Sequence, residues 1–388
     1  MNDEITAARK KRVQRIRRRR TAWFLFALAV VSLAVLLANT LTATTFLDIK
    51  DVCSAIFAPY GSYPVALESA GAVSEKQMSM AYAVLSEDAV TVYSQRGSIL
   101  GSFAHNLITP ELAAAGNRAV LYNIGGKEIV VYNRTSELAR FKTEYNIIDA
   151  AVSKRGTLAV LTRSDKYTAQ LSVYGNGKYE QTMTWSTNAG FPLLVRLQSD
   201  GDAAAVACIA AVNGQPVSVV TVIDTRSAEA LFTAQVNGIA ADILLDSGVT
   251  VVTDETAELY SMAGEQKAAY VYGDAPLLHV AHDEGSGLAL AFGDNSRPQI
   301  NSVVLLGGNL TVKATAQGVG AVRDMYLTRT GVYILGAQRI TEYNMSGEAK
   351  AYYSADSEAF ALIKTSGLLT LCADRLEKAE HIQLSEEA

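Results

Sequence analysis

The sequence is poor in the residues that mark several protein classes. Its 388 residues include only 3 Cys, 7 Pro and 2 Trp, and 19% of them are charged while 49% are hydrophobic. So few cysteines exclude a disulfide scaffold, and glycine without a period of three excludes collagen. The high apolar content excludes a disordered chain. We therefore expect a folded core.

Charge is divided unevenly along the chain. The formal net charge is −5, yet residues 1–20 carry nine Lys or Arg against Asp3 and Glu4, a net of +7. No charge occurs from Thr21 to Leu47, so the rest of the chain carries −12. An acidic domain of this size repels polyanions, and no nucleic-acid partner is expected.

Residues 21–42 predict a transmembrane helix. The run TAWFLFALAVVSLAVLLANTLT is uncharged, and as a helix it would span roughly 30 Å, the thickness of a bilayer's hydrocarbon core. Its basic flank predicts that residues 1–20 are cytoplasmic and that residues from about 43 are outside. Residues expected to contact the membrane surface are Arg17, Arg18, Arg19, Arg20 and Trp23.

A cleaved signal peptide is the alternative interpretation of this segment. Leu41, Thr42 and Ala43 could form a small-residue cleavage site. The apolar run exceeds the roughly 7–15 residues of a signal core, and the 20-residue basic head is long, so an uncleaved signal anchor is favoured. Residues 43–63 are expected to form a juxtamembrane stalk or a short helix that ends before Pro59.

From residue 64 onward, short apolar runs alternate with turns, which predicts strands. One turn recurs with a glycine at spacings of 36 to 47 residues, at Gly116, Gly156, Gly201, Gly248, Gly287, Gly331 and Gly367. We expect these glycines to supply the positive φ that tight hairpins require. A tyrosine recurs near the end of the third run of most units, and blade packing is its expected role at Tyr93, Tyr132, Tyr174, Tyr260 and Tyr343.

A period near 40 residues with four strands per unit predicts a β-propeller over residues 64–388. The runs give about eight blades, with seven possible. The last unit supplies only three runs, FALIK, LLTLC and RLEKAEHIQL. The segment PVALE, residues 64–68, is therefore predicted to return as its fourth strand and close the ring, which removes an exposed sheet edge.

Five stretches carry a resemblance to a known family. YPVALESAG, AYAVLSEDAVTVYSQRG, ELAAAGNRAVLYNIGGKEIVVYN, IIDAAVSKRGTLAVLTRSDKYTAQLSVY and LQSDGDAAAVACIAA, behind a basic tail and one apolar helix, resemble an uncharacterised domain-of-unknown-function family of membrane-anchored propellers from Firmicutes. The chain more distantly resembles PQQ-like and WD40-like propellers, including the scaffold BamB. The resemblance implies a single-pass protein of a bacterial plasma membrane and brings no catalytic residues.

The histidines and acids give no strong site. His279 and His282, beside Asp283 and Glu284, are the one cluster that invites a metal. Positions three apart on a strand point to opposite faces, so these are expected to be polar loop residues. Acid pairs such as Asp200 and Asp202 fit solvated turns, with calcium binding or acid–base work as the alternative.

The cysteines are isolated as well. Cys208 and Cys372 lie in apolar runs and are expected in the core, whereas Cys53 precedes the propeller and could be an exposed thiol or form an intermolecular disulfide. The chain also lacks G-x-S-x-G, a Walker A sequence and H-E-x-x-H. No catalytic residue, cofactor or metal is therefore predicted.

Two functions remain open. The first is a non-catalytic scaffold at the cell envelope that presents its loops and channel mouth to a protein or a glycan. The second is a propeller hydrolase or lyase acting on extracellular or wall carbohydrate with carboxylates as acid and base. The second requires carboxylates that converge at the channel, at least one with a raised pKa. A channel lined by Ala, Val and Ser would exclude it.

Overall fold

The computed structural model describes residues 23, 43–69, 71–283, 285–293 and 301–383. The chain divides into two units, Met1–Ile49 and Lys50–Ala388, and all described strands belong to the second. Within the described residues, no helix combines the length and the apolar character needed to cross a bilayer. The predicted membrane helix over 21–42 and the basic residues Arg17–Arg20 lie outside the described residues, except for Trp23, which is helical and 72% exposed.

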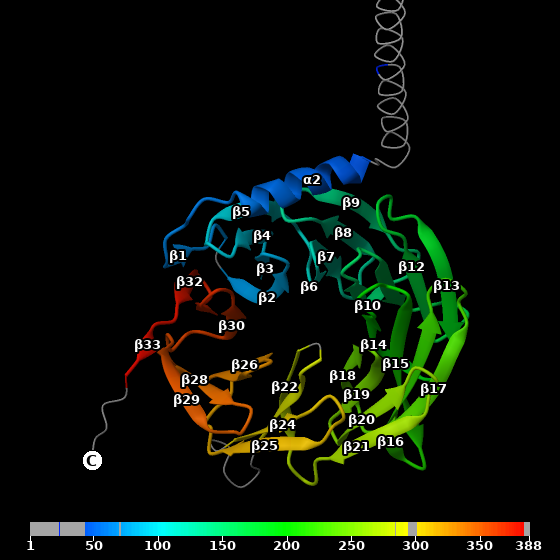
Figure 1. Cartoon of the computed structure of the whole chain (residues 1–388). Helices are drawn as coiled ribbons and strands as arrows, with labels where there is room; N and C mark the ends of the chain where they lie inside the picture. The colour runs from blue at the N-terminus through cyan, green and yellow to red at the C-terminus, as the bar shows by residue number, and fades with distance from the viewer. Residues whose placement is uncertain (1–22, 24–42, 70, 284, 294–300, 384–388) are drawn as a thin grey trace, which may run out of the picture. The chain divides into compact units, whose positions relative to one another are not determined.

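Eight antiparallel sheets are arranged around a ring in the second unit (Figure 1). Seven are built on four consecutive strands, and the eighth is completed by a strand from the start of the propeller. Each sheet is a blade whose first strand lies nearest the centre and whose fourth strand lies at the outer edge. The fold is therefore an all-β propeller with eight four-stranded blades, as the periodicity predicts. The alternative of seven blades is wrong.

The first four blades follow one another directly along the chain. Blade one is β2 (Ala72–Met78), β3 (Ala81–Ser86), β4 (Ala89–Ser94) and β5 (Ile99–Ala104). Blade two is β6 (Pro110–Ala115), β7 (Arg118–Asn123), β8 (Glu128–Tyr132) and β9 (Glu137–Lys142). Blade three is β10 (Ile147–Val152), β11 (Leu158–Thr162), β12 (Ala169–Tyr174) and β13 (Gln181–Thr187). Blade four is β14 (Phe191–Leu197), β15 (Ala203–Val212), β16 (Gln215–Asp224) and β17 (Ala230–Asn237).

The remaining blades complete the ring. Blade five is β18 (Ala240–Leu245), β19 (Gly248–Thr253), β20 (Thr256–Ser261) and β21 (Gln266–Val271). Blade six is β22 (Leu277–Asp283), β23 (Gly287–Phe292), β24 (Ser302–Leu306) and β25 (Val312–Gln317). Blade seven is β26 (Asp324–Thr328), β27 (Gly331–Leu335), β28 (Arg339–Asn344) and β29 (Ala349–Ser354). Blade eight is β30 (Ala361–Lys364), β31 (Leu368–Leu371), β32 (Arg375–Lys378) and β1 (Val65–Ala66).

The ring closes by a strand from the start of the propeller. β1 pairs antiparallel with β32, with Val65 opposite Leu376 and Ala66 opposite Arg375. The prediction that residues 64–68 complete the last blade is thus confirmed. The run from Arg375 onward is not one strand as predicted, because β33 (His381–Ile382) leaves blade eight and pairs with β29 of blade seven.

The repeated glycines serve two different geometric needs. Gly201 has φ +82°, the left-handed conformation predicted for these turns. Gly248 does not have a left-handed φ, and there a Cβ would lie 2.7 Å from the carbonyl oxygen of Tyr260 on the neighbouring strand. The prediction of positive φ is therefore wrong for Gly248, Gly331 and Gly367. Close approach of a strand carbonyl explains the first two, and nothing in the structure explains Gly367.

Aromatic side chains join neighbouring blades. The repeated tyrosines on the third strands are buried, apart from the half-buried Tyr343, so their predicted packing role is confirmed. Three of them contact a phenylalanine from the outer strand of the preceding blade. The pairs and their ring-centroid distances are Phe103 and Tyr132 at 4.4 Å, Phe141 and Tyr174 at 4.8 Å, and Phe232 and Tyr260 at 6.0 Å.

Helix α2 (Ala43–Ile56) precedes the ring, and its part from Lys50 onward is held to blades one and two. Asp51 accepts hydrogen bonds from Nε and Nη2 of Arg134 at 3.0 and 2.6 Å, and both side chains are fully buried. Arg134 also donates to the carbonyl oxygen of Ser79 at 2.7 Å. Further along, Arg96 donates to the carbonyl oxygen of Ala58 at 2.9 Å.

Candidate functional site: the central channel

The inner strands of blades one to six surround a cavity of about 420 Å³. Small residues of β6 and β10, such as Ala113 and Ala150, form part of its wall. Ionisable side chains interrupt this wall, namely Lys76, Glu111, Asp149, Lys154, Arg196, Asp242, Asp246 and His282. The channel is therefore not the Ala, Val and Ser surface that would exclude chemistry or polar binding.

Two salt bridges connect blades three, four and five on one side of the channel. Arg196 of β14 donates through Nη1 to Oδ2 of Asp149 at 3.1 Å and through Nε to Oδ1 of Asp242 at 2.7 Å. Burial alone would lower the pKa of Arg196, but the two carboxylates raise it. One guanidinium thus pairs with two carboxylates on the neighbouring inner strands.

Asp149 is also the acceptor that ties blades two, three and four together. Its Oδ1 accepts from the Tyr122 hydroxyl at 2.8 Å, and its Oδ2 accepts from the backbone N–H of Val195 at 2.9 Å. Burial and the adjacent Asp149 carboxylate raise the pKa of Tyr122. Tyr122 therefore remains a hydrogen-bond donor at any physiological pH.

An aspartate that accepts a hydrogen bond from the next backbone N–H is found on three of the inner strands. β10 and β18 each carry a register shift just before their aspartate, Asp149 and Asp242. Each aspartate accepts a hydrogen bond from the backbone N–H of the following residue at 2.9 Å. In β26, Asp324 accepts from the N–H of Met325 at 2.8 Å and from the N–H of Leu362 in blade eight at 2.7 Å. These aspartates link adjacent inner strands.

Sequence reasoning missed these three aspartates, although a signal exists. Each interrupts an apolar first run of its blade, as IIDAAV, AADILL and VRDMYL. An isolated acid in a strand that is otherwise apolar must find hydrogen-bond donors when the strand is buried. This pattern recurs in the first run of three blades and could have predicted that these aspartates accept hydrogen bonds within the fold.

Blades seven, eight and one present a different arrangement. Glu75 of β2 is half-buried, but its Oε2 is inaccessible to solvent and has no hydrogen-bond partner among the described residues. Burial and the nearby Asp324 carboxylate raise the pKa of Glu75 to about 8, against a smaller opposing effect of Lys76. Burial also raises the pKa of Asp324, although the N–H groups of Leu362 and Met325 oppose this shift.

The prediction that His279 and His282 are loop residues is wrong, because both lie on a strand. His279 and His282 both lie on β22, where His279 is close enough to Asp324 to oppose the rise of its pKa and His282 lines the cavity. The described residues contain no group of three or more His, Cys, Asp or Glu placed to hold a metal. Glu284 lies outside the described residues.

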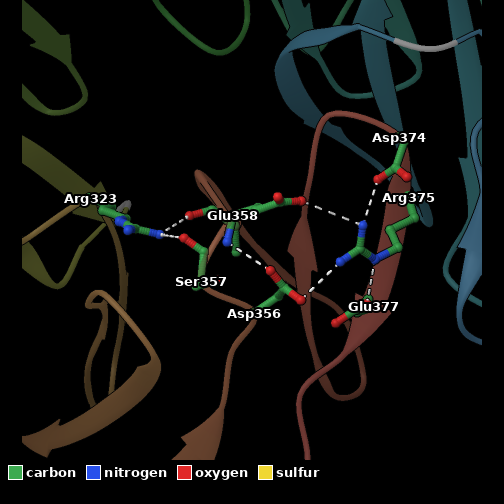
Figure 2. Close-up of polar contacts among 8 residues, drawn as sticks. Arg323, Asp356, Ser357, Glu358, Asp374, Arg375 and Glu377 are labelled. Carbon is green, nitrogen blue, oxygen red and sulfur yellow. Dashed lines mark hydrogen bonds and ion pairs between the residues drawn. The ribbon is translucent and has the colours of Figure 1, made fainter.

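A second charge cluster lies at the ring closure, around Arg375 of β32 (Figure 2). Arg375 donates to Glu377, Asp374 and Asp356 at 2.6, 2.7 and 2.8 Å, and Glu377 and Asp374 raise its pKa. Arg323, which directly precedes β26 of blade seven, donates to the carbonyl oxygen of Ser357 at 2.6 Å and so connects blade seven to this cluster. Because its groups satisfy one another, this cluster joins the closing strands and leaves the channel as the candidate site.

Comparison with known proteins adds a family to this geometry. A model described as a family of unknown function, DUF5711, matches residues 59–384. The chain belongs to this family. No curated protein matches this DUF5711 chain.

Solved structures share the fold of this DUF5711 propeller. The crystal structure of Saccharomyces cerevisiae Sqt1 matches with a TM-score of 0.60 and 8% identity, over 82% of this chain and 98% of Sqt1. The β-propeller domain of Myceliophthora thermophila Cps50 (Swd1) matches with a TM-score of 0.50 and 9% identity, over 70% of this chain and 95% of that one. Similarities this low in identity establish the propeller fold alone.

Proposed function

We propose that this DUF5711 propeller is a non-catalytic interaction scaffold of the cell envelope, which binds a protein or a glycan at its central channel. In this proposal, residues 21–42 anchor it in the plasma membrane of a Firmicutes bacterium, residues 1–20 are cytoplasmic and the propeller is extracellular. The uncharged run behind a basic head supports the anchor, and the ring of eight sheets supports the propeller.

The observation that carries the binding role is the cavity within the channel. Its volume of about 420 Å³ lies within the range of roughly 300–1,000 Å³ that is typical of ligand pockets. Asp149 and Asp242 are engaged by Arg196, so they hold the wall in place. Lys76, Glu111 and His282 line the same cavity and offer both charges to a polar ligand.

A pull-down from solubilised membranes tests the binding role. The bait is the full chain, compared with the cavity variant His282→Ala and with Asp165→Ala, which changes an exposed turn on blade three. We expect a protein or glycan that is recovered with the parent and with Asp165→Ala but lost with His282→Ala. Recovery of the bait alone, or equal recovery with both variants, would contradict the proposal.

The anchor has its own test. Intact cells are labelled with a membrane-impermeant amine reagent, and the labelled lysines are mapped. We expect exposed lysines of the propeller, such as Lys267 and Lys313, to react, whereas Lys10 and Lys11 react only after lysis. Labelling of Lys10 in intact cells, or release of the chain by an alkaline wash, would overturn the anchor.

A carbohydrate hydrolase or lyase is the second candidate, and one observation favours it. Glu75 has a pKa raised to about 8, so it is protonated near neutral pH as a general acid must be. The test is release of fragments from purified wall glycans by the full chain, with Glu75→Gln as the matched variant. Activity that disappears in Glu75→Gln would replace the scaffold by this enzyme.

A further inference from the structure

The second half of α2 and the residues after it have an unusual distribution of side chains. The side that packs on the propeller carries small or charged residues, Asp51, Ala55 and Ala58, all buried. Large apolar side chains lie on the opposite side, where Val52, Ile56, Phe57 and Tyr60 are 38%, 49%, 80% and 83% exposed. A helix of a soluble domain places its large apolar residues toward the core, so this distribution is reversed.

The exposed residues form one face. Ile56 lies four residues after Val52 and three after Cys53, the spacings that place helical side chains next to each other, and Phe57 and Tyr60 continue this face beyond the end of α2. Ile49, one turn earlier on α2, is exposed as well. We call Val52, Cys53, Ile56, Phe57 and Tyr60 the apolar face. Scattered exposed apolar residues need no explanation, but a contiguous patch marks an interaction site.

Contacts on the opposite side keep the apolar face turned away from the ring. The buried pair of Asp51 and Arg134, at 2.6 Å, holds the helix to the turn between β8 and β9. Arg96 donates to the carbonyl oxygen of Ala58 on this packed side. Its guanidinium also lies 4.5 Å from the ring centroid of Tyr60, so the apolar face contacts the propeller at this one end, where Tyr60 is still 83% exposed. The helix therefore cannot rotate its apolar face into the propeller without breaking a buried ion pair, which is strongly destabilising.

We propose that the apolar face lies in the outer interface of the membrane, so that the bilayer contacts the propeller beside blades one and two. This rests on the proposed anchor. The argument for lipid is chain continuity, because α2 begins at Ala43, directly after residues 21–42, the predicted membrane span. A helix that starts where a membrane span ends lies at the lipid surface, and tyrosine and phenylalanine suit the headgroup region.

The chain carries a natural probe for this proposal. Of its three cysteines, Cys208 and Cys372 are buried, as expected from the sequence, and Cys53 is exposed on the apolar face. The full chain is labelled at Cys53 with an environment-sensitive fluorophore and reconstituted in vesicles of phosphatidylglycerol and phosphatidylethanolamine. Lipids that carry a quencher either near the headgroup or deep in the acyl chain then report the depth of the label.

We expect on the order of a twofold loss of emission with the shallow quencher and a smaller loss with the deep one, because an interfacial helix is immersed by roughly 5–10 Å. The matched control is the label at Val271→Cys in a Cys53→Ser chain, since Val271 is an apolar residue 72% exposed on the outer strand of blade five. The control label should not be quenched by either lipid.

The outcomes separate this inference from the anchor on which it rests. If the chain floats with the vesicles but Cys53 is quenched no more than Val271→Cys, the lipid contact is wrong while the anchor stands. If the chain does not float, the anchor itself fails. Absence of quenching together with a disulfide between Cys53 of two copies would show that a second copy covers the apolar face, which also overturns the proposal.

Discussion

The two sides of the channel accommodate half-buried carboxylates in different ways. In blades three to five, Arg196 lies between Asp149 and Asp242, and every one of these groups has a charged partner. In blades seven, eight and one, burial raises the pKa of both Glu75 and Asp324, and the nearby Asp324 carboxylate raises that of Glu75 further. The first side is a permanent ionic link between blades, and the second is a site whose charge depends on pH.

The largest effect is expected from removing the acceptor of the first side. Asp149→Ala leaves the Tyr122 hydroxyl, the Val195 N–H and Arg196 without their shared partner. We expect the free energy of unfolding to fall by about 2–4 kcal/mol, the cost of several buried donors left unpaired. Chemical denaturation measures it, with the exposed Asp165→Ala as the control. A loss equal to that of the control would contradict the structural role of Asp149.

Removing the Arg196 guanidinium should lower the free energy of unfolding by a smaller amount. Arg196→Gln leaves two carboxylates close together, but the Arg196 side chain is 35% exposed, so water screens part of their repulsion. We expect a decrease of about 1–2 kcal/mol in the free energy of unfolding. The double variant Asp149→Ala with Arg196→Gln should lose less than the sum of the single changes, because the two residues are in contact. Strict additivity would show that they do not interact.

The second side should respond to pH instead. Between the unfolded pKa of 4.5 and the folded pKa of about 8, Glu75 is protonated in the folded state and ionised in the unfolded state. The contribution of Glu75 to the free energy of unfolding therefore falls as pH rises from 4.5 to about 8. Glu75→Gln should match the parent near pH 4.5 and exceed it by about 1–2 kcal/mol at pH 8. Denaturation across this range checks it, and parallel curves would contradict it.

The smallest effect is expected outside the channel. Arg375 has four carboxylate neighbours, yet the cluster lies at the surface of the ring closure, where solvent screens ion pairs. Arg375→Gln should leave the denaturation midpoint close to that of the parent. A shift as large as that of Arg196→Gln would mean that the closure, rather than the channel, depends on its charges.

More of the fold than of the candidate site could be predicted from the sequence, for a physical reason. Strand periodicity and a short last unit are local features, and they were enough to predict about eight blades, with seven as the alternative, and the return of residues 64–68. The partners of Asp149 and Glu75 come from other blades, so no spacing in the sequence relates them. The division of the last run into β32 and β33 also depends on a neighbouring blade.

The scaffold proposal is tested most directly by photocrosslinking in living cells. A photoreactive amino acid replaces Ser199, which lines the channel cavity, or Val271, which lies on the outer strand of blade five. The proposal predicts a discrete adduct with an envelope protein or glycan from position 199 and none from position 271. Identical adduct patterns from both positions, or no adduct from position 199, would contradict it.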